Sequence, residues 1–116
     1  MKRILALAAV SEAATGLVLL VDPPIVVRLL FGAEIIGTGI VIARIAGISL
    51  IALGIACWPG SKPRWALYGM VTYSTLAMVY LVYVGLTGGR GILLWPAVAV
   101  HAVLSLLLVL SSLTPD

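Results

Sequence analysis

The chain has 116 residues, of which 63% are hydrophobic and only 9% are charged, and its formal net charge is +3. A soluble domain of ordinary composition carries about 25% charged residues, so this chain has too little polar surface to enclose a water-soluble core. This composition excludes a soluble enzyme, a nucleic-acid-binding domain, a disulfide scaffold and a disordered tail. It favours an integral membrane protein, and four helical spans of about 20 residues each fit within the chain as a single domain.

The first predicted span covers residues 4–21 and ends at Asp22-Pro23-Pro24, because proline lacks the N–H that a helix needs and restricts the residue before it. A basic start followed by apolar residues also begins a signal peptide, but the hydrophobicity here continues without a break to residue 21, so we expect a retained span. Residues 25–32 are too short to cross a bilayer. They are predicted to lie at the interface, with Arg28 toward water.

Three further spans follow in chain order. The second is predicted over residues 35–58 and ends at a Pro-Gly pair, the third over residues 65–86, and the fourth over residues 92–113. The connections are short and contain proline or glycine, which are typical of turns. The predicted fold is therefore an all-α four-helix membrane bundle, with a short interfacial segment between the first two spans.

The basic residues of the short loops predict how the bundle lies in the membrane. The side that holds both termini and the loop between spans two and three carries four Lys or Arg residues, whereas the two on the opposite side are offset by acidic residues. Cytoplasmic loops are enriched in Lys and Arg, so both termini are predicted to be cytoplasmic. Aromatic residues that favour the interface agree with this arrangement: Trp58 and Trp65 on the inner side, Trp95 and Tyr83 on the outer side.

Three ionisable residues fall well inside the predicted spans: Glu12, Arg44 and His101. A charged group at the bilayer centre costs at least about 2.5–3.5 kcal/mol, so these side chains should face the bundle interior. At about 1.5 Å per helical residue, all three lie at roughly comparable depths from the cytoplasmic ends of their spans. We expect a buried Glu12–Arg44 ion pair, with His101 and a hydroxyl of the third span, represented by Tyr73, completing one polar layer.

Small residues surround two of these side chains. Ala8, Ala9, Thr15 and Gly16 lie three or four positions from Glu12, and the second span carries Gly39-x-x-x-Ala43-x-x-x-Gly47 beside Arg44. Such faces let helices approach closely, within one chain or between the chains of a homo-oligomer. They predict that Glu12 and Arg44 point into the bundle.

Two roles stay open for the polar layer. It can fix the register of the helices without binding anything, or it can bind a ligand or carry a proton. One histidine does not make a metal site, and a triad of Ser11, Glu12 and His101 has no specific spacing. We therefore predict neither catalytic residues nor a bound metal.

The chain is similar to two kinds of small membrane protein. Like the small multidrug resistance transporters, it has four short spans and a carboxylate, Glu12, in the first; Arg44 departs from that pattern, because a buried cation opposes a cationic substrate. It resembles more closely the small bacterial four-helix DoxX-like proteins. The residues that carry this resemblance are Glu12-x-x-x-Gly16-Leu17, Arg28-Leu29-Leu30-Phe31-Gly32-Ala33-Glu34, Ala43-Arg44-Ile45-Ala46-Gly47 and Leu94-Trp95-Pro96 followed by His101.

The DoxX-like resemblance implies a four-helix fold, and some such proteins accompany quinone-linked membrane redox systems. We therefore expect a multi-pass protein of the bacterial inner membrane that serves as a non-enzymatic module or accessory subunit, and we rank an enzyme acting by itself last. Its expected partners are the lipid bilayer and a membrane protein or a second copy of itself. No resident cofactor is expected, and a quinone or other small amphiphile is the ligand that the polar layer could bind. A proton-coupled transporter is the alternative.

Overall fold

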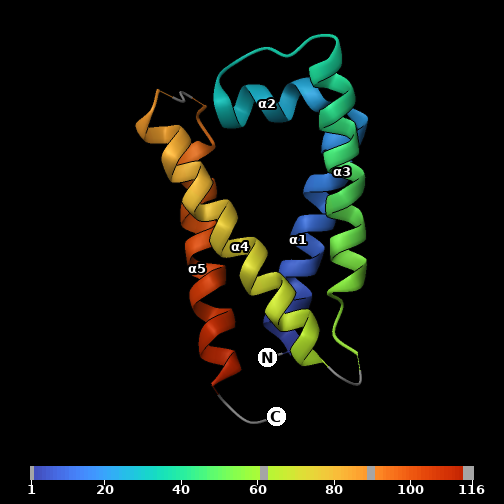
Figure 1. Ribbon diagram of the computed structural model, residues 1–116, viewed down its shortest axis with the longest axis vertical. Coiled ribbons are helices and arrows are strands. Elements are labelled where there is room, and N and C mark those ends of the chain that lie inside the picture. Colours follow the sequence, from blue (N-terminus) through green and yellow to red (C-terminus); the bar gives the residue numbers. More distant parts are fainter. Residues whose placement is uncertain (1, 61–62, 89–90, 114–116) are drawn as a thin grey trace.

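The computed structural model describes residues 2–60, 63–88 and 91–113. Over these residues the chain is all-α and contains no strand. Its five helices are α1 (Lys2–Val21), α2 (Pro23–Phe31), α3 (Thr38–Ala56), α4 (Pro63–Leu86) and α5 (Leu94–Ser112). The long helices form two antiparallel pairs, α1 with α3 and α4 with α5, and α2 lies across one end (Figure 1). We call this the α2 end, and the opposite one, where α1 begins and α5 ends, the terminal end.

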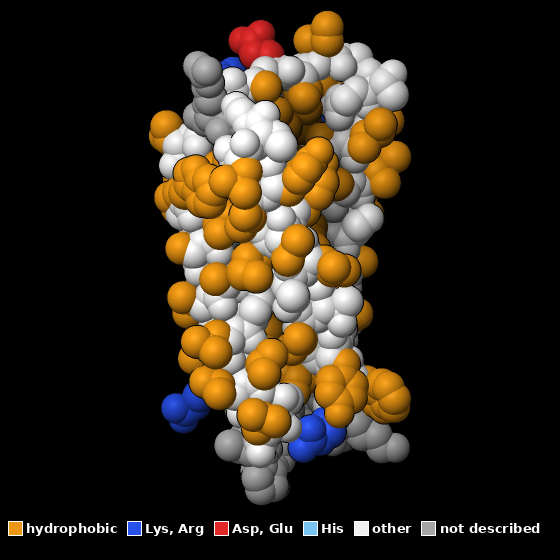
Figure 2. Space-filling view, turned by 60° about the vertical axis from the view of Figure 1, so that its left-hand side comes forward, with side chains coloured by type: hydrophobic (Ala, Val, Ile, Leu, Met, Phe, Trp, Pro, Cys, Tyr) orange, Lys and Arg blue, Asp and Glu red, His pale blue; other side chains and the backbone are white. Residues whose placement is uncertain are grey.

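Four helices are long and apolar enough to cross a membrane: α1, α3, α5 and residues Arg64–Leu86 of α4. Figure 2 shows apolar side chains over the height of the visible face, with Lys and Arg mostly at its lower end and acidic side chains at its upper end. The predicted all-α fold with four such helices is confirmed. The second span begins later than predicted, at Thr38, because Gly37 precedes it with a φ of 57°, outside the helical range.

The predicted interfacial segment is the short helix α2, which begins at Pro23. A proline suits the first turn of a helix, where its missing N–H would have no helical partner. The helix ends at Gly32, whose φ of 64° is left-handed and whose N–H donates to the Arg28 carbonyl. The Leu93 N–H also donates to the Leu29 carbonyl (2.8 Å), which ties α2 to the start of α5.

The α1–α3 interface is a contact between backbones. A Cβ atom on Gly47 would lie 2.6 Å from the Gly16 carbonyl oxygen, and one on Gly54 would lie 2.6 Å from that of Ala9. Only helices without side chains at these positions approach so closely. The small-residue faces predicted on the first two spans therefore do pack within the chain, although Gly39 lies outside the interface.

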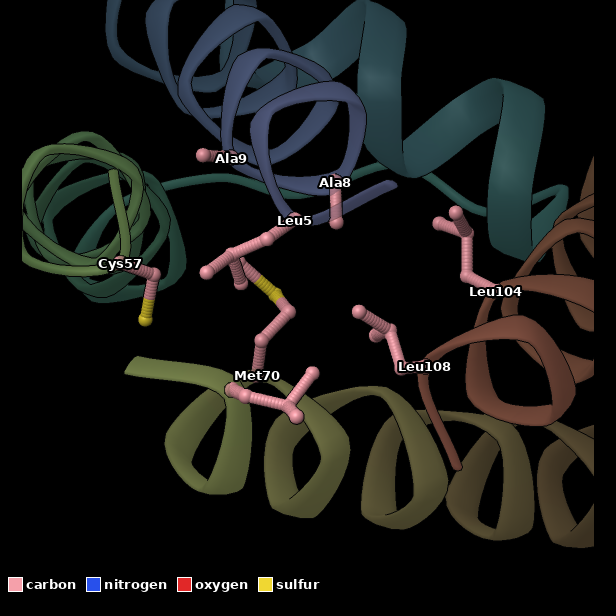
Figure 3. Packing of buried hydrophobic residues seen from close by; sticks show 8 residues of the cluster. Leu5, Ala8, Ala9, Cys57, Met70, Leu104 and Leu108 are labelled. Atoms are coloured by element: carbon pink, nitrogen blue, oxygen red, sulfur yellow. The ribbon is translucent and has the colours of Figure 1, made fainter. Parts of the chain in front are cut away.

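The apolar core lies in the terminal half of the bundle. In Figure 3, Leu5 of α1 and Met70 of α4 point toward each other, and Leu104 and Leu108 of α5 point into the same space. These residues are buried together with Ala8, Ala9, Leu67 and Cys57. Burial raises the pKa of the Cys57 thiol, which lies just beyond the end of α3. The core closes the bundle toward the terminal end.

The backbone contact between α1 and α3 predicts unequal effects of two glycine substitutions on the same helix. We expect Gly47→Ala to lower the free energy of unfolding by about 1–3 kcal/mol, because its Cβ would overlap the Gly16 backbone. In the control, Gly39→Ala, the new Cβ meets only Ile35 at an ordinary 3.5 Å, and alanine favours a helix. Titration with denaturant in detergent micelles, followed by circular dichroism, measures both. Equal effects would contradict the interface.

Candidate functional site

Three helices each carry a line of inward-facing residues, here called a stripe, that changes from apolar to polar. The change comes one helical turn beyond the core, toward the α2 end. Residues three or four positions apart share a helix face, and the apolar part of each stripe belongs to the core of the terminal half. The next residue toward the α2 end is polar on every stripe: Glu12 on α1, Ser74 on α4 and His101 on α5. The apolar residues beneath them are Leu5 and Ala8, Leu67 and Met70, and Leu108 and Leu104, respectively.

Glu12 and His101 are in direct contact. Nε2 of His101 lies 3.4 Å from Oε1 of Glu12, whose residue is only 3% exposed. Nδ1 of His101 is 2.8 Å from the Ala97 carbonyl oxygen, which only accepts hydrogen bonds, so Nδ1 carries a proton. If His101 carries only this proton and Glu12 is ionised, the lone pair of Nε2 faces the carboxylate and the two groups repel each other. A second proton, on Nε2 or on the Glu12 carboxyl group, makes the contact between the two side chains attractive.

Tyr73 joins this pair from α4. Its ring is tilted against the His101 ring, with the two centroids 6.2 Å apart, and its hydroxyl interacts with the Glu12 carboxylate. The structure thus brings together three of the four residues predicted for the polar layer, one from each of α1, α4 and α5. We call Glu12, Tyr73 and His101 the polar floor.

Arg44 does not belong to the polar floor, and the expected Glu12–Arg44 ion pair is not formed. The α1–α3 contacts place Gly47 opposite Gly16 and Gly54 opposite Ala9, so Arg44 lies level with Leu19, seven residues or about 10 Å along α1 from Glu12. α3 packs mainly on α1, which separates it from α5. The Arg44 side chain is exposed and has no partner among the described residues.

The position of Arg44 suits a side chain that reaches the membrane surface. Arg44 lies six residues after Thr38, the start of α3, or about 9 Å from the α2 end of that helix. Long basic side chains near helix ends extend toward the interface while their aliphatic part stays in the hydrocarbon. Arg44 is therefore better described as an interfacial cation than as the partner of Glu12.

A cavity of about 620 Å³ lies above the polar floor, between the two helix pairs. Glu12, Tyr73 and His101 line its deep end, and α2 lines the end toward the membrane surface. Apart from the polar floor, its walls are formed mostly by apolar side chains of α1, α2, α4 and α5, with Leu50 of α3 and Leu93 just before α5: Thr15, Val18, Leu19, Val26, Val27, Leu29, Leu30, Phe31, Leu50, Ala77, Tyr80, Leu81, Leu93, Pro96, Ala97 and Val100. Small-molecule sites typically have this volume and this mixture of apolar walls with few polar groups.

Ser74 is a fully buried polar residue that inspection of the sequence did not single out. It is fully buried, and its Oγ atom has no hydrogen-bond partner in the described part of the chain; the same is true of Nε2 of His101. The neighbouring hydroxyls, in contrast, are paired: Thr72 donates to the Tyr68 carbonyl, and Thr75 lies 3.5 Å from Ser105 Oγ. The spacing of Ser74 from Leu67 and Met70 was the signal that could have identified it.

The polar floor offers one carboxylate, one imidazole and one phenol, which together can donate and accept hydrogen bonds and hold a proton. Within residues 2–60, 63–88 and 91–113, no group of three or more His, Cys, Asp or Glu side chains lies together as a metal site would require.

Comparison of the chain with protein-family models, curated proteins and solved structures finds no match.

The contact between Glu12 and His101 predicts that the two side chains are coupled in stability. We expect a double-mutant cycle of Glu12→Gln and His101→Asn to give an interaction energy of about 0.5–3 kcal/mol, because the residues touch. Asparagine keeps a donor for the Ala97 carbonyl and removes Nε2, so the cycle reports the contact with Glu12. Denaturant titration in micelles measures it. In the control cycle, the changes in the free energy of unfolding caused by Glu12→Gln and Arg44→Ala should be additive. An interaction energy between these two substitutions would contradict the placement of Arg44.

The unpaired Ser74 hydroxyl predicts a stabilising substitution. We expect Ser74→Ala to raise the free energy of unfolding by roughly 1 kcal/mol, since a buried polar group without a partner is costly. Thr72→Val is the control with almost no expected effect, because its hydroxyl is exposed and bonded to its own helix. The same titration measures both variants. A loss of stability in Ser74→Ala would show that this hydroxyl has a partner.

Proposed function

We propose that this protein is a non-enzymatic module of the bacterial inner membrane that binds a quinone or another small amphiphile in the cavity above the polar floor. One observation carries the proposal: the cavity reaches a buried carboxylate. A polar layer that only fixed helix register would be enclosed by packed side chains. Here Glu12, Tyr73 and His101 line a cavity instead, so a bound molecule can form hydrogen bonds with this layer.

The chemistry of the floor fits a head group that both donates and accepts hydrogen bonds. The Tyr73 hydroxyl can donate to a carbonyl oxygen, and the Glu12 carboxylate can accept from a hydroxyl. A quinone presents carbonyl oxygens, and its reduced form, the quinol, presents hydroxyl groups. The apolar walls supplied by α1, α2, α4 and α5 would enclose the remaining hydrocarbon of the ligand.

The proposed placement in the inner membrane has both termini in the cytoplasm. Lys2, Arg3 and Arg64 lie at the terminal end, whereas the described basic residues toward the α2 end are Arg28 and the interfacial Arg44, with the acidic Asp22 and Glu34 nearby. This distribution follows the preference of cytoplasmic loops for Lys and Arg. The similarity of the sequence to DoxX-like proteins supports the same setting, in which the module would assist a membrane redox partner.

A proton-coupled transporter is the second candidate, and the contact between Glu12 and His101 favours it. The pair needs a second proton to be attractive, and both residues line the cavity, so a ligand that binds Glu12 would change how that proton is held. Transport requires flux across proteoliposomes that depends on pH and disappears in Glu12→Gln. Binding without flux supports the module.

Filling the cavity tests the proposed binding. In nonionic detergent, we expect a short-tailed benzoquinone to bind saturably to the wild-type protein and about tenfold more weakly to Ala97→Phe, a change of about 1.4 kcal/mol. Ala97 lines the cavity, and its carbonyl remains free to accept from His101. Isothermal titration calorimetry measures the affinity. Ala99→Phe, on the exposed side of α5, is the matched control. No saturable binding, or equal losses in the two variants, would overturn the proposal.

A further inference from the structure

The polar floor lies near the middle of the membrane. Glu12 is ten residues from the start of α1 and nine from its end, or about 15 and 14 Å along the helix axis. His101 lies at a similar height, seven residues after the start of α5 and eleven before its end. A ligand held at the floor therefore has its polar group at the bilayer centre, about 15 Å from either face of the hydrocarbon.

Both ends of the cavity are closed by apolar structure. Toward the terminal end, the core of Leu5, Met70 and Leu108 fills the bundle (Figure 3). Toward the α2 end, the cavity side of α2 is apolar, whereas Arg28 is exposed. The backbone contact of Leu30 with Gly91 and the hydrogen bond from Leu93 hold α2 against the start of α5. In the part of the chain that the structure describes, apolar side chains line both ends of the cavity, and neither end offers a polar route to the floor.

The cavity opens through its sides. Several of its lining residues remain exposed, among them Val18 on α1 at 48%, Tyr80 on α4 at 63% and Val100 on α5 at 53%; the others are Thr15, Leu93 and Pro96. All of them except Leu93, which directly precedes α5, lie within the helices that are long and apolar enough to span a membrane, so the surface around these openings faces hydrocarbon. A molecule reaches the floor by moving sideways out of the lipid.

We infer that the ligand is a membrane-dissolved lipophile with one small uncharged head, bound with its head at the bilayer centre and its tail toward α2. This inference rests on the proposed function, because it concerns the same cavity. A phospholipid is excluded, since its charged head group would have to lie at the bilayer centre while its tails met the surface. A water-borne solute is excluded as well, because it lacks both a route to the floor and a tail to fill the apolar walls.

A set of three added compounds tests the ligand class by native mass spectrometry of the full chain in nonionic detergent. The compounds are a long-chain alcohol, a phospholipid with tails of the same length, and a short water-soluble alcohol. We expect an adduct of the long-chain alcohol that is lost in Ala97→Phe and kept in the exposed-side control Ala99→Phe. Phospholipid adducts should be equal in all three proteins, and the short alcohol should give none.

The outcomes separate the inference from the proposed function. If the phospholipid or the short alcohol gives an adduct that Ala97→Phe removes, the cavity binds a ligand but the inferred class is wrong. If no compound, including the benzoquinone, gives an adduct sensitive to Ala97→Phe, the proposed function fails and this inference fails with it.

The orientation of the ligand has its own measurement. Trp95 lies at the start of α5, at the α2 end, whereas Trp58 and Trp65 lie at the terminal end and are exposed. In a Trp58→Phe/Trp65→Phe protein, Trp95 is the remaining tryptophan and reports on the α2 end. We expect an alcohol brominated at the far end of its tail to quench Trp95 more strongly than one brominated beside its head. The reverse order would overturn the inferred orientation.

Discussion

Hydrocarbon offers no hydrogen-bond partner to a polar side chain, and this constraint organises the bundle around Glu12. A carboxylate near the middle of a span must be covered by protein and matched by groups from other helices. In this chain His101 and Tyr73 provide that match from α5 and α4. The polar floor therefore joins the two helix pairs, above a core that packs them together on the terminal side.

α1 contacts both helix pairs because its two faces carry side chains of different size and polarity. One face carries Ala9 and Gly16 and lies in backbone contact with α3, while the other carries Leu5, Ala8 and Glu12 and faces α4 and α5. Small side chains toward one neighbour and a larger, partly polar stripe toward the others make α1 the central helix. α3 is consequently an outer helix, which accounts for the exposure of Arg44.

Much of this fold could be predicted from the sequence, because composition and proline positions act locally. Hydrophobic stretches of span length and the Pro23-Pro24 pair located the helices to within a few residues. The burial of Glu12 and its contact with His101 followed from the cost of charge in lipid. Tyr73 could be assigned to the same layer for the same reason.

The position of Arg44 could not be predicted in this way. Depths counted from the ends of the spans assume that all helices begin and end at common planes. In the structure, the glycine contacts offset α3 along α1, so that the end of α3 lies opposite about the seventh residue of the chain. The pattern of hydrophobic residues also could not predict which helices are neighbours, because every span is apolar around most of its circumference. Register and order depend on tertiary packing.

The cavity itself follows from the residues that continue the buried stripes toward the α2 end. Below the floor these stripes carry Leu, Met and, on α1, Ala8; at its level they carry Glu12, Ser74 and His101, and one turn above it they carry the small Thr15, Ala77 and Ala97. Small side chains on three helices at one level leave room that larger ones would fill, and unfilled volume lowers stability. In a chain of this size, a role limited to rigid packing would favour larger residues at these positions. Open volume directly above a buried acid is instead the arrangement that binding requires.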